Sequence, residues 1–300
     1  MFCIETDSLS YHFSPQEIAL NNICLQVPEG SLFGFLGPNG AGKTTTLRIL
    51  LGLLKKQKGS VRFFGKNFET HRIEILQKTG SLIEAPSIYS HLTATENLLI
   101  LQKIYQCKSE RIKEVLDIVG LSHTGKKKAG KFSLGMKQRL SIAMALLHQP
   151  ELLILDEPTN GLDPGGIIEI RELLKKLNAE FKTTVLVSSH LLSEIEKLVS
   201  HVGIIHKGNM LFQGTLNELH LMQSQNSVVS FHTNHPEMTK ELFTASEIHC
   251  EIKNNQVEIP LQDKEQIALL NRLLVENNIN VYEIKMIKND LESIFIDLVK

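Results

Sequence analysis

A glycine-rich segment near the start of the chain carries the residue types that hold nucleotide phosphates. It reads Gly-Pro-Asn-Gly-Ala-Gly-Lys-Thr-Thr over positions 37–45 and directly follows the apolar run 32–36. A strand, a glycine-rich loop and a helix N-terminus in this order let backbone N–H groups converge on phosphate oxygens. A chance match is the alternative, and such matches are rare in a chain of this length. The segment predicts a nucleoside triphosphate site.

Individual residues of this loop have distinct expected roles. Lys43 is placed to reach the β- and γ-phosphates, and the Thr44 hydroxyl is placed to ligate Mg²⁺. The glycines permit backbone conformations that are closed to residues with a side chain. The residues predicted to contact the nucleotide are Gly37, Asn39, Gly40, Gly42, Lys43, Thr44 and Thr45.

A pair of acids follows a second apolar run, 152–155. Asp156 can hold Mg²⁺ through its water shell, and Glu157 can orient and deprotonate an attacking water. The alternative is a charge pair at a helix N-terminus, but a Glu-Pro-Thr turn at a strand end favours the catalytic interpretation. Because buried parallel strands deliver their carboxyl ends to one edge of a sheet, we expect the runs 32–36, 152–155 and 185–187 to meet there.

The remaining pattern predicts an α/β fold with an added module. Strands before position 36 and a strand over 59–66 are expected in one mixed sheet, and 86–131 is expected to be a helical insertion. A linker is expected over 223–227. The order of elements after it is β-α-β-β-α-β, which predicts a ferredoxin-like module. Its strands are expected at 228–233, 248–252, 257–261 and 281–287, and its helices at 236–246 and 264–277, with a last helix at 291–299.

The segment 152–164 resembles the second nucleotide motif and following loop of ABC-type ATPases. It reads Leu-Leu-Ile-Leu-Asp-Glu-Pro-Thr-Asn-Gly-Leu-Asp-Pro. The segment Phe-Ser-Leu-Gly-Met-Lys-Gln-Arg at 132–139 stands where that family carries its signature, usually Leu-Ser-Gly-Gly-Gln. The resemblance covers residues 1 to about 221 and implies a P-loop ABC ATPase cassette there, with a helical subdomain at about 86–131. The pattern after the linker predicts an accessory α+β domain over 228–300.

The resemblance also implies site residues beyond the phosphate loop. Ser133 and Gly135 match the signature that contacts the γ-phosphate bound by the opposite subunit, whereas Met136 departs from the usual glutamine. His190 matches the switch histidine that contacts the γ-phosphate, and Asp163 matches the loop that couples two subunits. Lys43, Glu157 and His190 are therefore the predicted catalytic residues.

Two further positions carry an expectation from the family. Tyr11 stands where the family presents an aromatic ring to adenine, and the alternative is a half-buried strand tyrosine. Glu84 replaces the glutamine that usually senses Mg²⁺ and water, so the predicted metal-binding residues are Thr44, Glu84 and Asp156. Together with the altered signature, Glu84 resembles the subgroup that serves bacitracin-type and lantibiotic peptide resistance or immunity exporters.

The implied function is ATP hydrolysis, with ATP and Mg²⁺ bound, that drives a separate transmembrane permease. The implied partners are a second copy, or a paralogous ATPase subunit, paired head to tail. Soluble ABC ATPases that act on ribosomes or DNA, and nucleotide-dependent regulators, are the alternatives. Ribosome-acting forms usually hold two cassettes and DNA-acting forms insert a long coiled coil, and neither pattern is present in the sequence.

Composition narrows the class of protein further. The net charge of −1 over 300 residues gives no global attraction to nucleic acid or anionic lipid. The cysteines, at positions 3, 24, 107 and 250, are too scattered to predict a zinc site or a disulfide. The sequence contains no apolar run long enough to cross a bilayer. It therefore predicts a cytosolic chain that reaches the membrane only through its permease.

Overall fold

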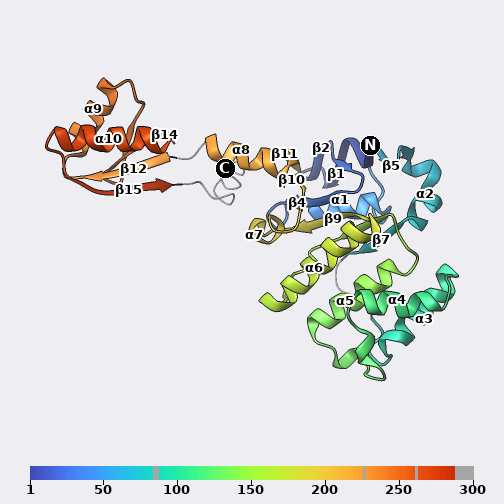
Figure 1. Cartoon of the computed structure of the whole chain (residues 1–300). Helices are drawn as coiled ribbons and strands as arrows, with labels where there is room; N and C mark the ends of the chain where they lie inside the picture. The colour runs from blue at the N-terminus through green and yellow to red at the C-terminus, as the bar shows by residue number, and fades with distance from the viewer. Residues whose placement is uncertain (84–87, 226–227, 261–262, 288–300) are drawn as a thin grey trace. The chain divides into compact units, whose positions relative to one another are not determined.

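The structure is a computed structural model that describes residues 1–83, 88–225, 228–260 and 263–287. The chain divides into two compact units, Met1–Leu216 and Asn217–Lys300 (Figure 1). Each unit has its own sheet system and its own apolar core. Each is therefore described by itself.

A six-stranded sheet organises the first unit. Its strands lie in the order β11 (Asn209–Thr215), β10 (His201–His206), β4 (Leu32–Leu36), β9 (Thr184–Ser189), β8 (Leu152–Leu155) and β7 (Thr79–Leu82). All neighbours are parallel except β10 and β11. The three apolar runs identified in the sequence are thus the adjacent strands β4, β9 and β8. Their carboxyl ends meet at one edge of the sheet, as predicted.

A separate antiparallel sheet contains the other strands of this unit. They are β1 (Phe2–Ser14), β2 (Glu17–Ile23), β3 (Gln26–Pro28), β5 (Lys58–Phe63) and β6 (Lys66–Asn67). The expectation that β1 and β5 join the same sheet as β4 is wrong. Every residue of β4 is buried, whereas β1 mixes buried and exposed residues along its length. A strand that is buried throughout is typical of a sheet covered on both faces, and a strand of mixed exposure is typical of a sheet covered on one face.

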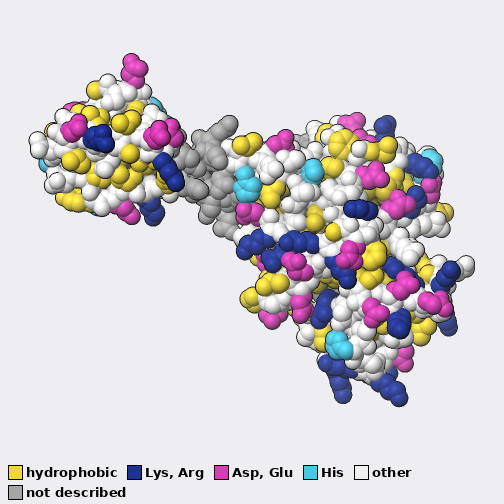
Figure 2. Space-filling view, viewed as in Figure 1, with side chains coloured by type: hydrophobic (Ala, Val, Ile, Leu, Met, Phe, Trp, Pro, Cys, Tyr) yellow, Lys and Arg dark blue, Asp and Glu magenta, His cyan; other side chains and the backbone are white. Residues whose placement is uncertain are grey.

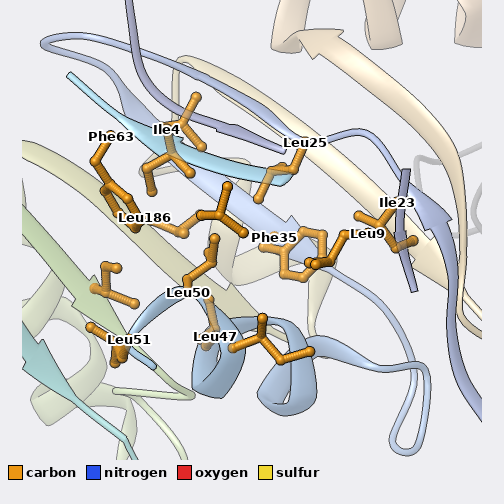
Figure 3. Close-up of a cluster of buried hydrophobic side chains, with 14 of the residues drawn as sticks. Ile4, Leu9, Ile23, Leu25, Phe35, Leu47, Leu50, Leu51, Phe63 and Leu186 are labelled. Atoms are coloured by element: carbon orange, nitrogen blue, oxygen red, sulfur yellow. The ribbon is translucent and has the colours of Figure 1, made fainter. Parts of the chain in front are cut away.

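The core between the two sheets holds the first helix in place. Helix α1 (Lys43–Leu50) sends Leu47 and Leu50 into a cluster with Phe35 of β4 and Phe63 of β5 (Figure 3). Burying a leucine or phenylalanine side chain contributes about 1.5–3 kcal/mol. Because α1 starts at the phosphate loop, this packing fixes the direction of its N-terminus.

Helices surround the sheets and fill the expected insertion. They are α2 (Phe68–Gln77), α3 (Ala94–Tyr105), α4 (Glu110–Ile118), α5 (Leu134–Leu146), α6 (Pro164–Phe181) and α7 (Leu192–Ile195), with short 3₁₀ turns at Ser122–Thr124 and Ala129–Lys131. Helix α3 begins with a capping box in which Thr93 and Glu96 satisfy each other's backbone N–H groups. Helices α3 and α4 both pack against α5. The site residues on α5 are therefore carried by a small helical assembly.

The second unit contains a four-stranded antiparallel sheet in the order β13 (Glu251–Lys253), β14 (Gln256–Pro260), β12 (Val228–Thr233) and β15 (Val281–Ile287). Alternate residues of β12 and β14 pack against α9 (Pro236–Ala245) and α10 (Lys264–Glu276). The chain order of these elements is the predicted β-α-β-β-α-β. The strand order is that of a ferredoxin-like module. The predicted helix 291–299 lies outside the described residues.

The predicted linker is helical in its first part. Helix α8 (Leu216–Gln225) extends into the predicted linker 223–227, and residues 226–227 lie outside the described part of the chain. In the described residues, no helix combines the length and the apolar character needed to span a bilayer. Over the face seen in Figure 2, basic and acidic side chains are interspersed.

Candidate active site

A cavity of about 500 Å³ lies over the phosphate loop. Its lining residues are Phe13, Glu17, Ile18, Ala19, Asn39, Gly40, Ala41, Gly42, Lys43, Thr44, Thr45, Glu157, Asn160 and His190. Residues from the ends of β1, β8 and β9 thus meet the loop that follows β4. Eight residues predicted from the sequence line this one cavity, which are Asn39, Gly40, Gly42, Lys43, Thr44, Thr45, Glu157 and His190.

Glycine is required at two positions of the loop for steric reasons. Gly42 has a φ of 110°, and a Cβ there would lie 2.7 Å from Leu20 Cδ2 and 2.8 Å from the carbonyl oxygen of Ala19. Gly37 does not line the cavity, and a Cβ on it would lie 2.4 Å from the carbonyl oxygen of Ile205. The loop therefore lies tightly against β2 and β10, which fixes the path of its backbone.

The Lys43 side chain is a buried part of the cavity lining. Its side chain is 6% exposed, and Nζ donates to the carbonyl oxygen of Gly37 at 2.7 Å. Nζ also lies 3.2 Å from Oε1 of Glu157. A buried cation held by backbone carbonyls at the start of a helix is well placed to attract phosphate oxygens.

The Glu157 carboxylate lies between Lys43 and His190. Its Oε2 is 2.8 Å from His190 Nδ1, and its side chain is 20% exposed. Glu157 has a φ of 47°, in the left-handed region that residues with a Cβ seldom adopt. Strained backbone at a site residue costs about 1–3 kcal/mol and persists only where surrounding contacts hold it. Here a carboxylate, an ammonium group and an imidazole are held together in the lining of the cavity.

Asp156 and Thr44 form the oxygen pair expected for Mg²⁺. The Thr44 hydroxyl donates to Oδ2 of Asp156 at 2.7 Å, and Asp156 is 8% exposed. Mg²⁺ prefers oxygen ligands and is commonly bound by one or two protein groups together with substrate phosphates. The described residues contain no group of three or more His, Cys, Asp or Glu side chains that could hold a metal. A site shared with nucleotide oxygens is consistent with both observations.

The aromatic residue at the cavity is Phe13 rather than the predicted Tyr11. Tyr11 packs against the apolar core and is absent from the cavity lining, whereas Phe13 lines the cavity and is 54% exposed. The two rings meet edge to face at 5.2 Å. The sequence carried one signal for Phe13, because it is the aromatic closer to the turn at the end of β1.

The remaining predicted residues lie elsewhere or are not described. Ser133 caps α5 by accepting the backbone N–H of Met136, and Asp163 caps α6 by accepting that of Gly166. Neither these residues nor Gly135 lines the cavity of their own chain. Glu84 lies outside the described residues.

Comparisons with known proteins agree with this geometry. A family profile described as ABC transporter matches residues 20–160. The bacitracin transport ATP-binding protein BcrA of Bacillus licheniformis is 46% identical over 299 residues, covering 99% of this chain and 97% of that protein. The lantibiotic transport ATP-binding protein SrtF of Streptococcus pyogenes is 43% identical over 194 residues, covering 65% of this chain and 83% of that protein. A dimeric ATP-binding cassette in a post-hydrolysis state with ADP and Pi aligns at a TM-score of 0.63 and 28% identity, covering 71% of this chain and 98% of that chain.

Proposed function

This chain belongs to the ABC transporter family of ATP-hydrolysing subunits, and from that premise we propose that it energises a separate permease for antimicrobial peptides. The peptide class rests on the names of the relatives, which concern bacitracin and lantibiotic transport. The observation that carries the proposal is the Glu157 carboxylate held between Lys43 and His190 in the cavity lining.

Phosphate binding uses the charge and the backbone of the loop. The triphosphate of ATP would lie along residues 39–45, which line the cavity at the start of α1, because a helix N-terminus favours anions. Lys43 would then pair with phosphate oxygens in place of Glu157. Release of the carboxylate from its ion pair leaves it free to accept a proton.

Glu157 is the proposed general base. It would accept a proton from the water that attacks the γ-phosphate, while the His190 imidazole orients the carboxylate through Nδ1. Thr44 and Asp156 would hold Mg²⁺, which supplies positive charge to the phosphate oxygens when bound. Phe13 is the proposed surface for the adenine ring.

A second subunit is proposed to complete each site. Ser133 is exposed and caps the N-terminus of α5, so this helix end can approach a phosphate bound by another copy. Asp163, at the N-terminus of α6, is exposed as well. The similarity to a dimeric cassette with ADP and Pi supports a head-to-tail pair.

A groove on the helical side is the proposed docking place for the permease. A cavity of about 310 Å³ has a mixed lining, in which the apolar residues include Leu82 of β7, Leu101 of α3 and Met144 of α5, and the polar ones are Thr79, Ser81 and Ser141. At its rim, Leu53 is 63% exposed and Tyr105 is 44% exposed. Exposed apolar side chains around a groove are typical of protein interaction sites. Ile83, the residue before Glu84 in the sequence, lines this groove. We keep the coupling role of Glu84 as a proposal.

Survival of cells under peptide challenge tests the proposed function. Cells that carry this gene together with the gene of its permease should survive bacitracin or a lantibiotic better than cells that carry the permease alone. The Glu157→Gln variant, expressed at the same level, should give no protection. Protection without measurable ATP hydrolysis by the purified complex would contradict the proposal.

A further inference from the structure

A buried serine joins the two acids of the active site. Ser188 lies in β9 and is completely buried. Its hydroxyl donates to Oδ1 of Asp156 and accepts the backbone N–H of Glu157 at 2.9 Å. None of the sequence motifs discussed above includes this residue.

The two bonds fix the direction of the hydroxyl. A serine hydroxyl has one proton to donate, and Ser188 gives it to Asp156, so its lone pair is left to accept from Glu157. The other oxygen of Asp156, Oδ2, accepts from the Thr44 hydroxyl. Both oxygens of Asp156 are thereby oriented, one toward the sheet and one toward the phosphate loop.

Strand β9 and the residue that follows it thus contact Glu157 at two places. Ser188 holds the backbone N–H of Glu157, and His190, two residues further along, lies 2.8 Å from its carboxylate. The backbone between these contacts has the left-handed φ of 47° noted above. The hydrogen bond from the Glu157 N–H to the Ser188 hydroxyl therefore helps to hold Glu157 in this strained conformation.

We propose that Ser188 is a positioning residue for hydrolysis, which sets the direction of the Glu157 side chain and of the Asp156 carboxylate together. This inference rests on the proposed role of Glu157 as the base. Ser188 does not line the cavity, so it acts through the two acids rather than on the nucleotide. Losing it should slow turnover and weaken the use of Mg²⁺, while the loop amides and Lys43 continue to bind ATP.

Steady-state kinetics of the purified full-length protein tests this inference. Residues that orient metal ligands typically contribute about 10–100-fold to activity, so Ser188→Ala should lower kcat by about that factor. The KM for ATP should change little, and the Mg²⁺ concentration for half-maximal rate should rise. Ser188→Thr keeps the hydroxyl on a strand residue type and should recover most of the lost rate.

A matched control separates positioning from loss of a buried hydroxyl in general. Ser31 is also buried, and its hydroxyl donates to the carbonyl oxygen of Pro28 in the turn before β4, away from both acids. Ser31→Ala should therefore keep the wild-type kcat. Equal kcat in Ser188→Ala and wild type would overturn the inference, as would equally slow, folded Thr and Ala variants. A wild-type protein without turnover, or a fully active Glu157→Gln, would instead contradict the proposed function.

Discussion

Two lysine–glutamate pairs of the same length lie in different units of this chain. Lys43 and Glu157 approach to 3.2 Å with side chains 6% and 20% exposed. Lys253 and Glu251 also approach to 3.2 Å, but both side chains are 58% exposed. The N–O distance alone therefore does not distinguish the buried pair at the cavity from the pair on the surface. The surroundings of each pair distinguish them.

The sheets that carry these pairs explain the difference. Glu157 follows β8 at the edge where neighbouring parallel strands end, so His190, Ser188 and the phosphate loop all converge on it. Glu251 and Lys253 lie on β13, a short strand with one described partner, β14, in an antiparallel sheet. Antiparallel neighbours end at opposite edges, so they do not gather side chains at one place.

The largest contrast between the pairs should appear on removing one negative charge from each. Glu157→Gln keeps the shape of the side chain but cannot act as a base, so kcat should fall by about 10²–10⁴-fold. ATP binding should survive because the loop amides and Lys43 are unchanged. Glu251→Gln, the matched change, should keep the wild-type kcat. ATPase kinetics and nucleotide titration measure both effects, and similar kcat values for the two variants would remove the distinction.

Destabilising only the second unit should sharpen the contrast. Phe243 is completely buried and meets Phe231 edge to face at 5.1 Å. Phe243→Ala should cost this unit about 3–5 kcal/mol of stability. Hydrogen exchange should then show faster exchange in β12 and β14 but not in β4 and β8, with unchanged ATP affinity. Loss of ATP binding in a variant whose first unit remains protected would mean that the nucleotide site depends on the second unit.

A smaller effect within the first unit separates two aromatic rings. Phe13→Ala should raise the KM for ATP about tenfold, because stacking on a base contributes about 1–3 kcal/mol. Tyr11→Ala should mainly lower the melting temperature, because Tyr11 packs on the core. Measuring KM for ATP and for a triphosphate without a base checks the assignment, since Phe13→Ala should affect only the former. The reverse pattern would return the role to Tyr11.

Sequence reasoning predicted which residues lie together where they directly follow a strand. The phosphate loop, Asp156, Glu157 and His190 each follow an apolar run, and parallel pairing brings those runs together. Ser188 carried no such signal, because a serine in an apolar strand has no visible partner until the register places β9 beside β8. That Phe13 lines the cavity was not predicted, because the path of β1 at its exposed end depends on irregular pairing with β2.

The local sequence pattern also did not predict that the antiparallel strands form a separate sheet. Its strands β1 and β5 are far apart in sequence and pair through tertiary contacts, so short apolar runs did not reveal which sheet they join. In the second unit, periodicity did predict the elements. Val257 and Ile259 alternate as in a strand, and Ile267, Leu270 and Leu274 have helical spacing. Period, rather than composition, was the useful signal there.

The smallest expected effect concerns the exposed pair itself. Glu251 and Glu258 raise the pKa of Lys253 above its ordinary value, first through the hydrogen bond from Lys253 to Glu251. A lysine whose pKa is higher in the folded state adds stability below the pKa of the unfolded state, about 10.4, and loses that stability as pH rises through the folded value. Lys253→Ala should therefore lower the melting temperature slightly at pH 7, with the difference disappearing at strongly alkaline pH. Added salt should reduce the difference at pH 7 too, because an exposed pair is screened. Thermal melts of wild type and variant across pH and salt measure both trends. If the difference in melting temperature persisted in high salt, the pair of Lys253 and Glu251 would not behave as a solvent-exposed pair. Its contrast with Lys43 and Glu157 would then weaken.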